Sequence, residues 1–138
     1  MNAFTQQRPS ITLAGARAVI AKAHEVAQAN GWHIAVAVVD HSGALIAFER
    51  DDQAIGITTD VAVGKARTAA LLQAPSKSFE DMINAGCPSF LSTPGTTPLE
   101  GGVPLLAGHD VVGAVGISGA HGPNDSLVAV QAAAALNG

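Results

Sequence analysis

The chain has 138 residues, of which 13% are charged, 48% are hydrophobic and 4% are aromatic, and its formal net charge is −4. This length predicts one domain with a hydrophobic core of its own. The few basic residues argue against nucleic-acid binding, because neutralising phosphates takes clustered Lys and Arg. The longest uninterrupted apolar run, residues 34–39, is too short to span a membrane.

Residues 1–9 are expected to form a flexible N-terminal arm, and residues 10–138 a single domain. The arm is polar and contains no apolar stretch of the signal-peptide kind, so a cytoplasmic protein is expected. The single cysteine, Cys87, excludes an internal disulfide and a multi-cysteine site, and no metal site is predicted. Charged residues are about half as frequent as the ~25% of ordinary soluble domains. We therefore expect part of the surface to be buried in a homo-oligomer.

The first half of the domain begins with a helix and a hairpin. The helix is predicted to begin after Thr12, whose hydroxyl can cap it, and to end at Asn30-Gly31, where Gly adopts the left-handed conformation readily. Two apolar segments, residues 34–39 and 44–48, flank a polar turn and predict an antiparallel hairpin. The first segment is apolar on both faces, which favours the centre of a sheet.

Two further helices and a long loop are predicted next. Thr58 or Thr59 is expected to cap a helix that runs to about Leu72. A short third helix is predicted to begin at Ser78. Residues 86–102 are rich in Gly and Pro, which predicts a loop. Long loops in compact domains are usually functional or mobile.

A second hairpin and a last helix complete the chain. The hairpin is predicted from residues 103–106 and 111–118, and the helix is expected to begin at Pro123 or Asn124. Pro104 cannot donate to a strand ladder, so the strand that contains it is expected at an edge. The order α-β-β-α-α-β-β-α, with hairpins in place of crossovers, predicts an α+β fold in which helices flank an antiparallel sheet.

A resemblance to a known family rests on several segments, taken in chain order. They are Ile11–Leu13, Ile34–Asp40, Gly43 with Ala47–Arg50, Lys65–Ala69, Gly101–Leu105 and Val112–Gly119. In this order they resemble the GlcG/HbpS family, from about residue 10 to the end of the chain. The C-terminal domain of PduO-type cobalamin adenosyltransferases is similar. The resemblance implies a profilin-like α/β fold, assembly into dimers, tetramers or octamers, and, in some members, binding of heme.

The Gly-rich segment from Gly113 to Gly122 favours a nest of backbone N–H groups at a helix start, where a carboxylate or phosphate can bind. The alternative is that these glycines turn the chain and let a helix pack close to the sheet. Lys65 has three donors on a long stem and can reach an anion in a pocket, or else lies on the surface. Arg50 can hold a carboxylate with two hydrogen bonds, or pair with a nearby Asp.

The ligand is therefore expected to be small and either anionic or aromatic, and its predicted binding residues are Arg50, Lys65, Ser118, Gly119, His121 and Gly122. We expect the pocket where Lys65, Arg50 and the loop 118–122 converge. Losing a charge-assisted hydrogen bond weakens affinity by roughly ten- to a hundredfold. Lys65→Ala is expected to have this effect with little change in folding, because Ala suits a helix.

Three functions remain open on the sequence. The first is heme binding, with His121 or His24 as the axial ligand of the iron. The second is an isomerase, tautomerase or lyase acting next to a carbonyl, with His121 or Asp40 as catalytic residues that move a proton and Lys65 stabilising an enolate. The third is a non-catalytic accessory protein. His33, beside Trp32 at a strand entrance, is predicted to be a surface residue.

Overall fold

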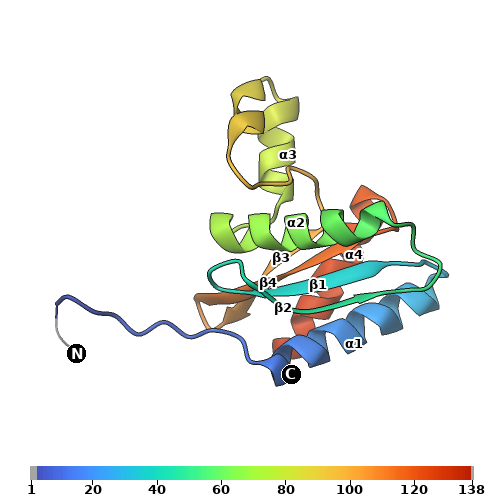
Figure 1. Ribbon diagram of the computed structural model, residues 1–138, viewed down its shortest axis with the longest axis horizontal. Helices are drawn as coiled ribbons and strands as arrows, with labels where there is room; N and C mark the ends of the chain where they lie inside the picture. The colour runs from blue at the N-terminus through green and yellow to red at the C-terminus, as the bar shows by residue number, and fades with distance from the viewer. Residues whose placement is uncertain (1–2, 138) are drawn as a thin grey trace.

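A computed structural model describes residues 3–137, and its centre is an antiparallel sheet of four strands in the order β2-β1-β4-β3 (Figure 1). Both predicted hairpins are confirmed, β1 with β2 and β3 with β4, and the two hairpins join through β1 and β4. The strand bounds are β1 Ala35–Asp40, β2 Leu45–Arg50, β3 Gly102–Ala107 and β4 Asp110–Ser118.

Helices cover both faces of the sheet, and those in the described residues are α1 Leu13–Ala29, α2 Ile57–Leu72, α3 Lys77–Asn84, α4 Gly122–Ala133 and the 3-10 turns η1 Pro88–Ser92 and η2 Ala134–Asn137. Helix α2 lies on one face, and α1 with α4 lies on the other (Figure 1). Helix α3 stands off from the body beyond α2. The predicted α+β fold and its element order are confirmed.

The alternation of side chains along β1 divides the core into two unlike layers. Val36 and Val38 face α1 and α4, where the layer is built from large aliphatic side chains. On the other face, Ala35 and Ala37 meet a layer that is almost entirely alanine. All four of these side chains are fully buried, as expected for the predicted central strand.

A pair of glycines lets α2 rest directly on the sheet. Gly102 and Gly116 are opposite each other in the β3–β4 ladder. A Cβ atom on Gly116 would lie 2.5 Å from the Ala66 backbone nitrogen and would also collide with the Ala62 carbonyl oxygen. A Cβ on Gly102 would collide with the Lys65 carbonyl oxygen. The close packing of helix on sheet, one of the two interpretations of these glycines, is therefore confirmed for Gly116.

Local sequence signals located three features well. The Gly15 N–H donates to the Thr12 hydroxyl at 3.0 Å, so Thr12 caps α1 as predicted. Strand β3, which contains Pro104, lies at the edge of the sheet as predicted. Gly31 ends the first helix region in the left-handed conformation, with a φ of 72°.

The starts of three helices differ from the predictions. Helix α2 begins after Gly56, and the Thr58 hydroxyl instead donates back to the Ile55 carbonyl at 2.6 Å. Helix α3 begins after Ser76, whose hydroxyl donates to the Leu99 carbonyl at 2.6 Å. Helix α4 begins one residue early, at Gly122. The Thr58 hydroxyl bonds to a preceding carbonyl in place of a first-turn N–H group, so it does not cap α2. Ser78 is already inside α3, where its N–H donates to the Pro75 carbonyl at 2.9 Å.

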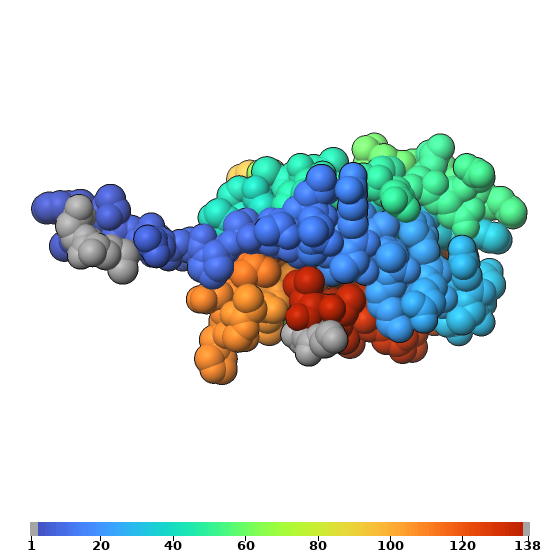
Figure 2. All heavy atoms as spheres, turned by 90° about the horizontal axis from the view of Figure 1, so that it is seen from below, coloured from blue at the N-terminus to red at the C-terminus, as the bar shows by residue number. Residues whose placement is uncertain are grey.

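Residues 3–9 are exposed and extend away from the body at the end of the molecule where α1 begins (Figure 2). The flexible arm of residues 1–9 and the domain of residues 10–138 stay predictions, and residues 1–2 and 138 lie outside the described residues. Within the described part of the chain, every helix is too short or too polar to cross a membrane.

Candidate functional site

A cavity of about 590 Å³ opens at the end of the sheet where β1 begins and β4 ends. Because Ala35 pairs with Ser118, the residues just before β1 lie beside those just after β4. The β2–α2 loop and the first turns of α2 complete the walls. This volume lies within the roughly 300–1,000 Å³ of small-molecule sites.

The cavity walls are mainly apolar and carry a few polar groups. Ile55 and Ile57 are 70% and 61% exposed, although both are large and apolar. Trp32 and Leu99 extend the apolar lining. Apolar walls with a small number of polar groups are the usual construction of a ligand pocket.

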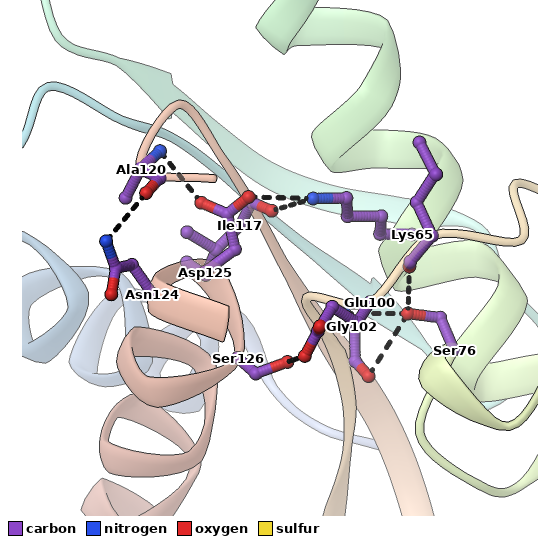
Figure 3. Close-up of polar contacts among 10 residues, drawn as sticks. Lys65, Ser76, Glu100, Gly102, Ile117, Ala120, Asn124, Asp125 and Ser126 are labelled. Carbon is purple, nitrogen blue, oxygen red and sulfur yellow. Dashed lines mark hydrogen bonds and ion pairs between the residues drawn. The ribbon is translucent and has the colours of Figure 1, made fainter. Parts of the chain in front are cut away.

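Lys65 lines the cavity, as predicted, but its charge is already neutralised (Figure 3). Its Nζ lies 3.0 Å from Asp125 Oδ2 and donates to the Ile117 carbonyl at 2.9 Å, and the two charged side chains are 4% and 3% exposed. Removing Lys65 would strand a buried carboxylate, which is strongly destabilising. The expectation that Lys65→Ala leaves folding nearly unchanged is therefore wrong.

The loop between β4 and α4 is held by the first turn of α4 (Figure 3). The Ala120 N–H donates to Asp125 Oδ1 at 2.9 Å, and the Asn124 side-chain amide donates to the Ala120 carbonyl at 3.0 Å. The Asp125 N–H donates to the His121 carbonyl at 2.7 Å. One N–H of the predicted nest of backbone donors, that of Ala120, is thus already bonded to the carboxylate of Asp125.

His121 lines the cavity from an unusual backbone conformation. It is the residue before α4 and has a φ of 73°, which side-chain-bearing residues seldom adopt. Within residues 3–137, its imidazole makes no hydrogen bond to the protein. Ser118 and Gly119 line the same cavity, whereas Gly122 does not and lies against Glu100.

Arg50 and His24 lie in a second hollow, of about 410 Å³, which is polar and open. His24 Nε2 is 2.7 Å from Glu49 Oε1, and Arg50 Nη1 is 3.5 Å from the Thr59 hydroxyl. The predicted convergence of Arg50 with Lys65 is wrong. Its physical reason is the strand order, because β1 separates β2, which carries Arg50, from β4, which leads into the loop.

Asp40 lies at the opposite end of β1 from the cavity, paired with Gly113. Its carboxylate accepts hydrogen bonds from the Ser42 hydroxyl at 2.7 Å, the Ser42 N–H at 2.8 Å and the Ala44 N–H at 3.0 Å. The Ser42 hydroxyl is the largest of the causes that hold the pKa of Asp40 below its ordinary value. Asp40 therefore organises the hairpin turn, and its predicted place beside Lys65 in a catalytic site is wrong.

His33 is the cavity residue that sequence reasoning set aside. Its Nδ1 is 3.0 Å from Asp51 Oδ2, so Asp51 orients the ring and leaves Nε2 as the second nitrogen. The Gln53 N–H, and then His33, hold the pKa of Asp51 below its ordinary value. One sequence signal could have placed His33 in the site. His33 stands two residues before β1, and because Ala35 pairs with Ser118 it lies opposite the loop that follows β4.

Comparison with known proteins gives a consistent result. A model of the family described as haem degrading protein HbpS-like matches residues 11–134. Protein GlcG of Escherichia coli strain K12 is 44% identical over 103 residues, which cover 75% of this chain and 77% of GlcG. A double mutant of Streptomyces reticuli HbpS is similar in structure, with a TM-score of 0.90, 34% identity and coverage of 99% and 93%. A complex of PduOC with heme has a TM-score of 0.83, 25% identity and coverage of 93% and 96%.

Proposed function

The chain belongs to the HbpS-like family, and on this basis we propose that it binds heme in the cavity beside the loop 118–121, with His121 as the iron ligand. The observation that carries the proposal is the imidazole of His121, which lines an apolar cavity and makes no hydrogen bond within the described residues. The heme complex of the similar PduOC supports the choice of ligand.

The cavity walls suit the chemistry of heme. The macrocycle is apolar and planar, and Trp32, Ile55 and Ile57 offer apolar surface for it. A neutral imidazole is a common ligand of heme iron. The carboxylates of heme are proposed to remain at the open mouth, in water, because the charge of Lys65 is satisfied by Asp125.

His33 is the competing iron ligand in this cavity. A ligating histidine usually donates its other ring nitrogen to a carboxylate or carbonyl, as His33 does to Asp51. That hydrogen bond also raises the cost of turning the ring. His121 is preferred because its ring is not held by another side chain.

The test is hemin titration followed by absorbance, with the wild type and the variants His121→Ala, His33→Ala and His24→Ala. The wild type is expected to show a saturable Soret shift, and His121→Ala to change its position. His24→Ala is the matched control, because His24 lies in the other hollow. A change confined to His24→Ala would move the site to that hollow. A wild-type spectrum equal to that of hemin with an unrelated protein would reject heme binding.

We also propose that the chain assembles into a homo-oligomer. The support is the low charge together with large apolar side chains on the surface outside the cavity, among them Leu45, Leu91 and Val130, which are 52–63% exposed. Burying such side chains between subunits removes apolar area from water, at roughly 25 cal/mol per Å². Sedimentation equilibrium at micromolar concentration is expected to give a mass of two chains or more, and a single-chain mass would contradict this.

A further inference from the structure

We propose that Asp125, anchored by Lys65, is the positioning residue for His121, an inference that rests on the proposed role of His121 in heme binding. In this proposal Asp125 contacts neither the heme iron nor the rest of the heme. It acts through the backbone of the loop that carries His121. The ion pair thus sets where the imidazole stands before any ligand arrives.

The carboxylate of Asp125 connects two parts of the molecule. Its Oδ1 accepts from the Ala120 N–H at 2.9 Å, on the loop, and its Oδ2 lies 3.0 Å from Lys65 Nζ, on α2. Lys65 also donates to the Ile117 carbonyl at 2.9 Å, at the end of β4. The loop is therefore held from both layers that flank the sheet.

The conformation of His121 needs such support. A φ of 73° is unfavourable for a residue with a side chain, and such conformations persist when the surroundings determine them. Here both neighbouring carbonyl groups are engaged, since Asn124 donates to the Ala120 carbonyl and the Asp125 N–H donates to the His121 carbonyl. Releasing these bonds would let His121 return to an ordinary conformation and turn its ring from the cavity.

Burial explains why a charged pair is used. Lys65 and Asp125 are almost fully covered, so their attraction is screened much less than that of a surface pair. Each polar atom of the pair has a partner, as a buried charge requires. The sequence suggested that Lys65 donates hydrogen bonds to a bound anion. In this proposal Lys65 instead holds Asp125, which holds the loop.

The experiment uses the full chain with Lys65→Met/Asp125→Asn, which removes both charges and leaves neither stranded. The matched control is Lys77→Met/Asp81→Asn, an exposed pair on α3 with Nζ 2.7 Å from Oδ1. The first readout needs no heme and is the hydrogen exchange of the Ala120 amide by NMR. It is expected to be about ten- to a hundredfold faster in the buried-pair variant and unchanged in the control.

The second readout is the hemin spectrum and the rate of hemin release. The buried-pair variant is expected to lose the His121-dependent Soret position and to release hemin at least tenfold faster. A folded variant with wild-type exchange at Ala120, or with a wild-type hemin spectrum and release rate, would overturn the positioning role. If hemin does not bind the wild type, the proposed function fails, while amide exchange still decides whether the pair holds the loop.

If the buried-pair variant does not fold, Asn124→Ala tests whether side-chain contacts to the loop position His121. It removes the hydrogen bond to the Ala120 carbonyl and leaves the ion pair in place. It is expected to accelerate hemin release at least severalfold, with wild-type unfolding behaviour. Unchanged release from this variant would overturn the claim that loop contacts position His121.

Discussion

Gly116→Ala tests the contact on which the position of α2 depends. Adding one methyl group places a carbon 2.5 Å from the Ala66 backbone nitrogen and closer still to the Ala62 carbonyl oxygen. Both atoms belong to the backbone of α2, so no side-chain rotation relieves the clash. The helix has to move away from the sheet by roughly 1 Å to relieve the contact with the Ala62 carbonyl oxygen.

The expected loss of stability follows from the rigidity of this layer. Overpacking a core costs about 1–3 kcal/mol, and a backbone clash in a fully buried alanine layer belongs at the upper end. With about 2.1 cal/mol/K per residue, the unfolding entropy of 138 residues is about 0.29 kcal/mol/K. A loss of about 3 kcal/mol therefore lowers the melting temperature by about 10 °C.

Thermal unfolding followed by circular dichroism at fixed protein concentration measures this shift. Gly15→Ala is the matched control, because Gly15 is helical and its added Cβ meets chiefly the flexible side chain of Ile11. Its melting temperature is expected to stay within about 3 °C of wild type. If Gly116→Ala melts within the same range, α2 does not rest on the sheet as described.

Three further predictions concern buried charge, pH and capping. Lys65→Met and Asp125→Asn are each expected to cost about 3–5 kcal/mol, because each strands the partner's charge, and the double variant less than their sum; additive losses in urea unfolding would contradict the pairing. The lowered pKa of Asp40 means that its ionised form stabilises the fold above the unfolded pKa of about 3.9 and that this stability is lost as the pH falls further. Asp40→Asn should therefore flatten the fall in urea midpoint between pH 5 and pH 3, and an unchanged slope would show that Asp40 does not contribute. Thr12→Ala should lower the free energy of unfolding by about 1 kcal/mol, as measured by chemical denaturation, and no loss would mean that the cap is not formed in solution.

The elements were predictable because their signals are local. The run of residues 34–39 reads as a central strand from its composition alone, and Pro104 marks an edge because it lacks an N–H. Helix starts were less predictable: the Thr58 hydroxyl bonds to the Ile55 carbonyl, and Ser78, the predicted start of the third helix, lies one residue inside α3. A capping residue is recognised only when no competing carbonyl is near, and this depends on the tertiary structure.

The site was predictable only in part, because its contacts join distant segments. Of the predicted loop 118–122, residues 118–121 line the same cavity as Lys65, but the carboxylate that neutralises Lys65 comes 60 residues later in the chain. Nothing near Lys65 in the sequence indicates that partner. His33 lines the cavity because β1 pairs with β4. Arg50 lies outside the cavity because β1 lies between β2, which carries Arg50, and β4.

Both ends of the described chain lie at the end of the sheet away from the cavity. The Ile11 N–H donates to the Val112 carbonyl near the start of β4, and Leu136 lines a small hollow with Pro9. Ser118 and the cavity are at the other end of that strand. A linker attached at either terminus therefore tethers the protein to a sensor chip with the cavity mouth directed to the solution. Immobilised in this way, the protein can be screened against compound libraries without blocking the binding site.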